Sequence, residues 1–140
     1  MSFNQLIQII YSTTLIFNII AIIGNFKIFS KAGINPFKAI IPVYNNYLLY
    51  RISWKQPNAF FLWFACYFGG NIMCNSTSLI YNILGIICLL GSLYINFLQS
   101  KKLAQSFGHG LPFALGLFLL TPIFVFILGF SKDIYHGPQD

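Results

Sequence analysis

The sequence predicts an all-α integral membrane protein, and three observations lead to that expectation. Only 7% of the 140 residues are charged, against about a quarter in a water-soluble domain, so charged side chains are too few to cover a globular surface. Hydrophobic residues make up 57% of the chain and gather in long uncharged runs. Seven of the eight Lys and Arg residues fall in two segments between these runs. We therefore expect residues 1–140 to form a single domain whose main solvent is lipid.

Four apolar runs are candidates for transmembrane helices, and they cover residues 6–26, 59–73, 79–98 and 111–130. About 20 apolar residues are needed to cross the hydrocarbon core, so the short second run, with Gly69 and Gly70 near its end, is the weakest of the four. We expect four spans. If the second run enters the membrane and turns back, three spans remain and the tail changes side.

Residues 37–54 are too polar for a helix surrounded by lipid, because polar side chains interrupt the apolar ones. Aromatic residues recur there at spacings of three and four, which aligns them along one stripe of a helix. Such a stripe suits the headgroup boundary, where an aromatic ring is half wet. We expect one interfacial or re-entrant amphipathic helix, begun or kinked by Pro42. The aromatic residues are Tyr44, Tyr47, Tyr50 and Trp54, and the polar ones are Lys38, Asn45, Asn46 and Arg51.

The basic residues predict the orientation, because Lys and Arg are retained on the cytoplasmic side of a membrane. Segments 27–58 and 99–110, the second of them expected to be a polar loop, carry seven of the eight basic residues. The N-terminus, the polar turn at 74–78 and the tail from residue 131 then share the other side, an N-out, C-out arrangement. The lysines that set this topology are Lys27, Lys31, Lys38, Lys55, Lys101 and Lys102.

Two groups of polar residues are candidate functional sites. The first lies on the helix expected at 37–54, and its amides either cap the helix and bond to loop backbone or contact a ligand or partner. The second is a set of amides within the spans, which either hydrogen-bond between helices, at about 0.6–2 kcal/mol each, or line a polar solute path. The first group is Tyr44, Asn45, Asn46, Tyr47, Arg51 and Trp54, and the second is Asn18, Asn82 and Asn96.

Catalytic and metal-binding patterns are missing from the sequence. The only carboxylates, Asp133 and Asp140, lie in the tail, so no carboxylate pair falls within a span. His109 and His136 are expected on opposite sides of the membrane, where they cannot share a metal ion. We therefore expect no enzyme, no cofactor and no metal site. The basic residues lie beside apolar spans, which indicates anionic lipid headgroups as partners rather than nucleic acid.

Two blocks of the sequence carry a family resemblance. The first has Lys-Ala-Gly at 31–33, Ala-Ile-Ile-Pro-Val-Tyr-Asn at 39–45 and then Trp54; the second has Leu-Ala-Gln-Ser-Phe-Gly at 103–108 and Ile-Leu-Gly-Phe at 127–130. Together they resemble DUF5684, a family of small bacterial integral membrane proteins of unknown function. Some members of the family are joined to signal peptidase I or carry its name. That protease uses a Ser-x-x-Met motif that this chain lacks, so the resemblance implies at most a partner of such an enzyme.

These observations together predict a small, multi-pass, non-enzymatic protein of the bacterial cytoplasmic (inner) membrane. Its expected role is that of a subunit or an accessory or assembly factor in a larger membrane complex, and its expected partners are other membrane proteins or further copies of itself. The alternative is a small solute transporter or channel formed by homo-oligomerisation. The amides within the spans favour this alternative.

Overall fold

A computed structural model describes all residues, 1–140, and its regular structure is entirely helical. One long helix precedes a short 3-10 helix, and five further helices follow before an extended tail. The helices are α1 (Phe3–Lys31), η1 (Pro36–Ile40), α2 (Pro42–Ser53), α3 (Ala59–Cys74), α4 (Leu79–Ser106), α5 (Leu111–Leu119) and α6 (Thr121–Phe130).

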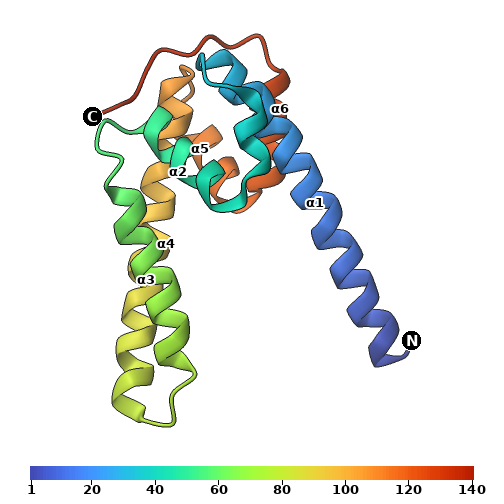
Figure 1. Cartoon of the computed structure of the whole chain (residues 1–140), viewed down its shortest axis with the longest axis vertical. Helices are drawn as coiled ribbons and strands as arrows, with labels where there is room; N and C mark the ends of the chain where they lie inside the picture. Colours follow the sequence, from blue (N-terminus) through green and yellow to red (C-terminus); the bar gives the residue numbers. More distant parts are fainter.

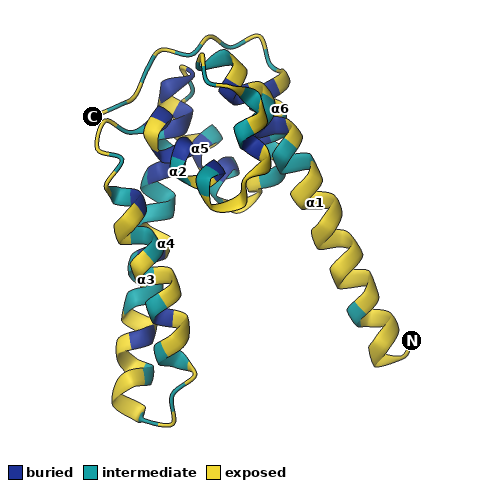
Figure 2. Ribbon diagram, viewed as in Figure 1, coloured by how far each residue is buried: buried dark blue, intermediate teal, exposed yellow.

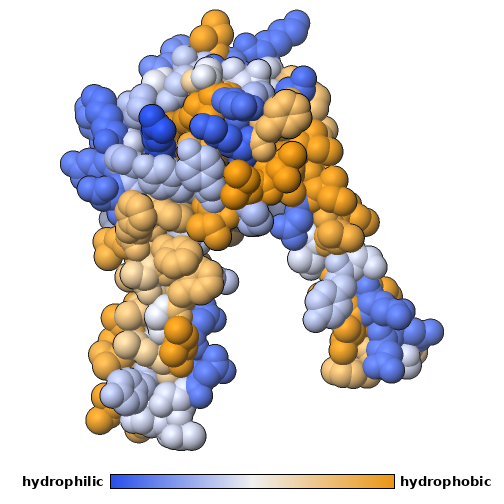
Figure 3. Space-filling model, in the orientation of Figure 1, coloured by the Kyte–Doolittle hydropathy of each residue, from blue (hydrophilic) through white to orange (hydrophobic).

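The helices form a head from which two legs extend (Figure 1). The head contains η1, α2, α5 and α6, the C-terminal ends of α1 and α4, and the tail. One leg, the α1 leg, is residues 3–23 of the first helix. The other, the α3–α4 leg, is the antiparallel hairpin of residues 59–98, and its helices pack closely because Gly70 and Gly85 face each other across the seam. The legs diverge, and open space separates them (Figure 3).

The hydrophobic core lies in the head, where buried residues concentrate (Figure 2). Apolar side chains at spacings of three and four on each helix face inward, as expected for amphipathic helices that meet at one core. The α1 leg contributes none of them and is exposed along its length. The core residues are Ile28 and Phe29 of α1, Ala39 of η1, Leu48, Leu49 and Ile52 of α2, Leu103, Ala104 and Phe107 near the end of α4, Ala114 and Leu117 of α5, and Val125 and Leu128 of α6.

Two helices, α1 with 29 residues and α4 with 28, are long and apolar enough to cross a membrane. They contain the first and third predicted spans. The second predicted span is a continuous helix, α3, of 16 residues. The all-helical fold class is therefore confirmed, whereas the number of spans is not settled by helix length alone.

The expected polar loop at 99–110 is wrong over most of its length, because α4 continues to Ser106. Three polar residues of this stretch, Gln99, Ser100 and Ser106, are buried rather than solvated. The Gln99 amide donates to the Ser53 hydroxyl at 3.4 Å, and Ser106 donates to the Lys102 carbonyl at 2.9 Å. Packing of Leu103 against the head core stabilises this last part of the helix. Only the residues after Ser106 form the loop.

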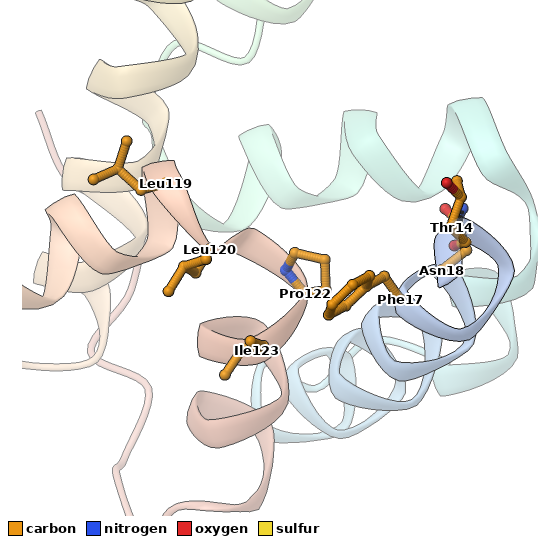
Figure 4. A pocket seen from close by; sticks show the side chains of 7 residues that line it. All are labelled: Thr14, Phe17, Asn18, Leu119, Leu120, Pro122 and Ile123. Carbon is orange, nitrogen blue, oxygen red and sulfur yellow. Dashed lines mark hydrogen bonds between the residues drawn. The ribbon is translucent and has the colours of Figure 1, made fainter. Parts of the chain in front are cut away.

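The expected fourth span at 111–130 is also wrong as a continuous helix. It divides at Leu120 into α5 and α6, which turn back on each other and are too short to cross a membrane separately. Pro122 explains the break, because it lacks an N–H group and its ring clashes with the carbonyl of Phe118 in a continuous helix. The turn of this hairpin lies beside the middle of α1 (Figure 4).

The tail lies at the end of the molecule where the basic segments lie, whereas the expected N-out, C-out arrangement separated it from them. The His136 amide donates to the Ser106 carbonyl at 2.7 Å, and the Gln139 amide donates to the Ser53 carbonyl at 2.9 Å. The α5–α6 hairpin returns the chain to the end of the molecule where α4 ends. His109 and His136 therefore lie at the same end of the molecule, although the sequence predicted them on opposite sides of the membrane.

The helix expected at 37–54 is divided into η1 and α2. Pro42 begins α2 at its first position, as one of the two expectations for this proline had it. The turn before η1 follows the sequence closely, since Gly33 adopts φ +73°, and the Asn35 side chain accepts from the Phe37 amide at 3.1 Å. Both η1 and α2 pack into the head, and their expected interfacial or re-entrant position in a membrane stays a prediction.

Candidate functional site

The candidate residues of α2 point to three different places, so they do not form one binding face. Asn45 is 8% exposed and lies one turn before the core residues Leu48 and Leu49. Asn46 is exposed and lines a groove where α2 meets α3 and α4. Arg51 is exposed and lines a separate pocket near the tail.

The aromatic stripe of α2 exists, and two of its tyrosines, Tyr47 and Tyr50, pack against α3. Tyr44 stacks on Tyr47 with ring centroids 6.1 Å apart. Tyr47 and Tyr50 each meet the Phe60 ring edge-on at 5.6 Å, and Tyr50 is only 4% exposed. Trp54 caps the C-terminus of α2 and pairs with Gln139 of the tail. Tyr47 and Tyr50 therefore join α2 to the first turn of α3.

A groove of about 440 Å³ brings together two of the candidate amides, Asn46 of α2 and Asn96 of α4. We call it the Asn46–Asn96 groove. Neither amide makes a hydrogen bond within the chain, whereas Asn18 on α1 does. The groove lies at the junction of the head and the α3–α4 leg, and its walls are mostly aromatic. The other lining residues are Pro42, Val43, Phe60, Trp63, Phe64, Tyr67 and Phe68.

A second hollow of about 340 Å³ extends the groove along the α3–α4 leg, sharing Trp63, Tyr67 and Asn96 with it. It adds two polar residues, Asn71 and Ser92, whose side chains donate to carbonyls of their own helices at 2.7 Å. No charged side chain, His or Cys lines either hollow. The groove thus offers amide groups and aromatic faces to an uncharged polar partner, and it lacks a His or carboxylate that would act as a general acid or base.

Asn18 lies beside the turn of the α5–α6 hairpin, with Thr14 on the same side of α1 (Figure 4). The hollow between them measures about 370 Å³, and Leu120 and Pro122 line its other side. The Asn18 amide donates to the Thr14 carbonyl at 2.9 Å, so it bonds back to the preceding turn of its own helix. No side-chain hydrogen bond joins Asn18 to another helix of this chain, and its expected role, in a bond between helices or in a polar solute path, stays a prediction.

Three other amides have buried side-chain oxygens without a partner: Asn25, Asn45 and Asn82. Asn82 does not bond to another helix through its side chain; only its backbone carbonyl is near the Cys74 thiol, at 3.9 Å. Asn25 occupies a place on α1 that matches that of Asn45 on α2, one turn before residues of the head core. An unsatisfied buried acceptor costs about 1–3 kcal/mol, so these amides leave hydrogen-bonding capacity unused inside the fold.

The lysines expected to set the topology all lie at the head end. Lys31 donates from Nζ to the carbonyl oxygens of Leu128 and Ser131, at 2.7 and 2.6 Å, and so joins the ends of α1 and α6. Lys27 lies over the Phe130 ring at 5.4 Å. Lys38, Lys55, Lys101 and Lys102 lie in η1, after α2 and near the end of α4. Both legs are free of charged residues.

The two carboxylates also lie at the head end, and each has a partner there. Asp133 lies 2.6 Å from the His109 ring nitrogen Nε2, and hydrogen bonds from Ser131 and then His109 hold the pKa of this carboxyl below its ordinary value. Asp140 lies 2.7 Å from Lys55 Nζ, and this contact lowers the pKa of Asp140. The acidic side chains therefore fasten the tail to the head.

Sequence reasoning missed the residues that make the wall of the groove. Phe60, Trp63, Phe64, Tyr67 and Phe68 recur at spacings of three and four, the signal that identified the stripe on α2. It was available in the sequence but is hidden within an apolar run. Buried polar residues of α4 such as Gln99 have no such signal, because their partners come from the end of α2.

Comparison with known proteins bears on the whole region from η1 to the tail. A family model described as "Family of unknown function (DUF5684)" matches residues 37–138. The chain belongs to this family. The DUF5684 region includes the α3–α4 leg and the groove, and therefore extends well beyond the two blocks that carry the sequence resemblance. All of α1 lies before it. No curated protein and no solved structure matches the chain.

Proposed function

We propose that this DUF5684 protein is a multi-pass protein of the bacterial cytoplasmic membrane that binds a membrane-spanning helix of a partner between its two legs. It acts as a subunit or accessory factor of a larger membrane complex and carries out no chemistry of its own. The α1, α3 and α4 helices cross the bilayer, and the α5–α6 hairpin enters from the head side and returns to it.

The charge distribution supports this placement. All eight Lys and Arg residues lie at the head end, and the legs carry none, so the positive-inside rule puts the head in the cytoplasm. The N-terminus and the turn between α3 and α4 then face outward, and the tail faces the cytoplasm. Apolar side chains dominate the surface of the upper legs, and hydrophilic side chains gather around the head (Figure 3).

The observation that carries the proposed role is the isolation of the α1 leg. Its apolar side chains are exposed on every side, and no other helix of this chain packs on it below the hairpin turn. Lipid can solvate these apolar groups. It offers no hydrogen-bond donor to the side-chain oxygen of Asn18, which lies beside the hairpin turn and on the same stripe of α1 as Asn25.

The α3–α4 leg presents a complementary wall. In the Asn46–Asn96 groove the side-chain amides of Asn46 and Asn96, which make no hydrogen bond within the chain, lie beside aromatic rings. A transmembrane helix carrying Ser, Thr or Asn on one face would bury those rings and bond to the amides, each bond contributing about 0.6–2 kcal/mol in a membrane. Uncharged walls exclude a charged solute as the preferred occupant of the groove.

Site-specific photocrosslinking in native membranes tests this proposal. A photoreactive residue is placed at Asn18 or at Asn96, and a control is placed at Ile16, which is 57% exposed and lies about 200° around α1 from Asn18. We expect Asn18 and Asn96 to crosslink to the same membrane protein and Ile16 not to. Absence of a protein adduct at both inner positions would contradict the proposal.

A homo-oligomeric transporter or channel is the second candidate, and one observation favours it. The turn of the α5–α6 hairpin, with Pro122, meets the polar side of α1 at a hollow of about 370 Å³, and broken helices with polar side chains are a feature of solute sites in transporters. Here the inner positions would crosslink to a second copy of the chain. Solute flux in reconstituted vesicles would then be lost on Asn18→Leu substitution.

A further inference from the structure

A pocket on the cytoplasmic side of the head differs from the other hollows of the molecule, because two cationic side chains line it. It measures about 410 Å³ and lies between the turn that follows α1, the outer face of α2 and the tail. Lys38 of η1 and Arg51 of α2 provide the positive charges. The buried side chains of Leu48 and Ile52 provide an apolar floor.

The chain has no carboxylate left to neutralise these two cations. It contains only two acidic side chains, and Asp133 and Asp140 are engaged by His109 and Lys55 respectively. Lys38 has a weaker contact, over the Tyr44 ring at 5.7 Å, and Arg51 has no ion pair. Two like charges that share a small pocket repel each other, so a counter-charge from outside the chain stabilises this arrangement.

The walls of the pocket are held in place by the tail. The Tyr135 hydroxyl donates to the Ile52 carbonyl at 2.5 Å, and Pro138 lines the pocket beyond it. Asn35, which lines the opposite side, is fixed by accepting from the Phe37 amide. The pocket is thus assembled from segments far apart in the sequence, and it exists only when the tail lies across the head.

We propose that this pocket binds the phosphate group of an anionic molecule, with Arg51 and Lys38 as its two cationic contacts. A guanidinium pairs with two phosphate oxygens at once, and an ammonium adds a point charge, which is the usual combination for phosphate recognition. The volume suits a phosphate with an attached group such as glycerol better than a bare ion. Its source is either an anionic lipid of the inner leaflet or a soluble phosphorylated compound.

The test compares the wild type with two variants that lose equal charge. K38Q/R51Q removes both pocket cations, and K101Q/K132Q removes two cations that do not line the pocket. K38R/R51K keeps the charge and serves as the conservative variant. All four proteins are placed in nanodiscs, and equal elution profiles show that they are folded.

The lipid arm uses nanodiscs of phosphatidylglycerol and phosphatidylcholine in equal amounts and measures retained lipid by native mass spectrometry. The soluble arm uses phosphatidylcholine alone and measures the change in Tm on adding glycerol 3-phosphate, against sodium chloride of equal ionic strength. In the lipid arm we expect K38Q/R51Q to retain about tenfold less phosphatidylglycerol than the wild type, or in the soluble arm to lose the rise in Tm on adding glycerol 3-phosphate. In the same arm K101Q/K132Q should stay close to the wild type, and K38R/R51K should lie between them. The arm that responds identifies the source of the phosphate.

Equal behaviour of K38Q/R51Q and the wild type in both arms would overturn the inference. So would an equal loss in K101Q/K132Q, since it would reflect general surface charge. The soluble arm does not depend on the position of the legs in a membrane. Failure of the partner-binding proposal, seen in the crosslinks, is therefore distinguishable from failure of this one.

Discussion

Gly24 of α1 and Gly129 of α6 approach so closely that a Cβ atom added to Gly129 would lie 2.6 Å from the Gly24 carbonyl oxygen. A Cβ atom added to Gly24 would lie 2.7 Å from the backbone nitrogen of Phe126. Backbone atoms cannot rotate out of the way as side chains can. This contact holds the α5–α6 hairpin against α1, and Lys31, seven residues further along α1, joins the same pair of helices.

Substitution of Gly129 by Ala should therefore separate the hairpin from α1. We expect a loss of about 1–3 kcal/mol in stability, the usual cost of overpacking, and a lower Tm in detergent. Gly91→Ala is the control, because nothing lies within 4 Å of a Cβ atom added there. Ala is the better helix former, so the control should be neutral or slightly more stable. Equal Tm values for G129A and G91A would contradict the close approach.

Two tyrosines of the head, Tyr50, which is buried, and Tyr135, which is partly buried, should respond in opposite ways to removal of the hydroxyl. The Tyr50 hydroxyl has no partner, whereas the Tyr135 hydroxyl donates to the Ile52 carbonyl. Tyr50→Phe removes an unsatisfied polar group and should leave the Tm unchanged or raise it. Tyr135→Phe should cost about 1 kcal/mol and lower it. Each variant serves as the control for the other, and a loss in Tyr50→Phe larger than that in Tyr135→Phe would show that Tyr50 has a partner.

Attachment of the tail through Asp133 should depend on pH in the acid range. The pKa of this carboxyl is lowered in the folded protein from its ordinary value of 3.8, by hydrogen bonds from Ser131 and His109. A lowered pKa adds stability that is complete above about pH 4 and is lost as the pH falls through the folded pKa. The effect is small, at most about 1 kcal/mol, because the pair is partly exposed.

The measurement for this prediction is the Tm of the wild type and Asp133→Asn between pH 3 and 7. The wild type should have the higher Tm above about pH 4, and the two curves should converge below it. Asp140→Asn removes the other carboxylate and tests whether the effect is specific to the His109 contact. A difference in Tm that grows as the pH falls would have the wrong sign for this account.

Much of the architecture follows from local signals in the sequence. The uncharged runs predict the legs, Gly33 and Asn35 predict the turn after α1, and Pro42 predicts the start of α2. These features depend on residues close together in the chain, so propensity and patterning are sufficient to find them. The lysines that the sequence places in two segments lie together at the head end of the molecule.

The errors all concern contacts between distant segments. The run at 111–130 has the composition of a span, and Pro122 alone predicts a kink rather than a reversal; the reversal depends on Gly24 and Lys31 of α1. Hydropathy likewise assigns Gln99 to a loop, because its buried partner Ser53 is more than 40 residues away. No signal in a single sequence joins such pairs.

In the candidate site, too, local features follow from the sequence, whereas contacts between distant segments do not. The spacing of Asn46 and its aromatic neighbours predicts a helix with a polar and an aromatic side, and α2 is such a helix. What the amide faces depends on how α3 and α4 pack beside it, and this brought Asn96 into the same groove. The pocket at Arg51 requires the tail to cross the head, which the expected topology excluded.

The position of the two chain ends relative to the membrane tests the arrangement on which both proposals depend. In a chain with Cys66, Cys74 and Cys88 replaced by Ala, single cysteines are placed at Ser2, Thr77, Gln105 and Lys132. Intact cells are then treated with a membrane-impermeant maleimide. We predict labelling of Ser2→Cys and Thr77→Cys from outside, and of Gln105→Cys and Lys132→Cys only after permeabilisation. Labelling of Lys132→Cys from outside, with Gln105→Cys protected, would show a fourth span and contradict the account.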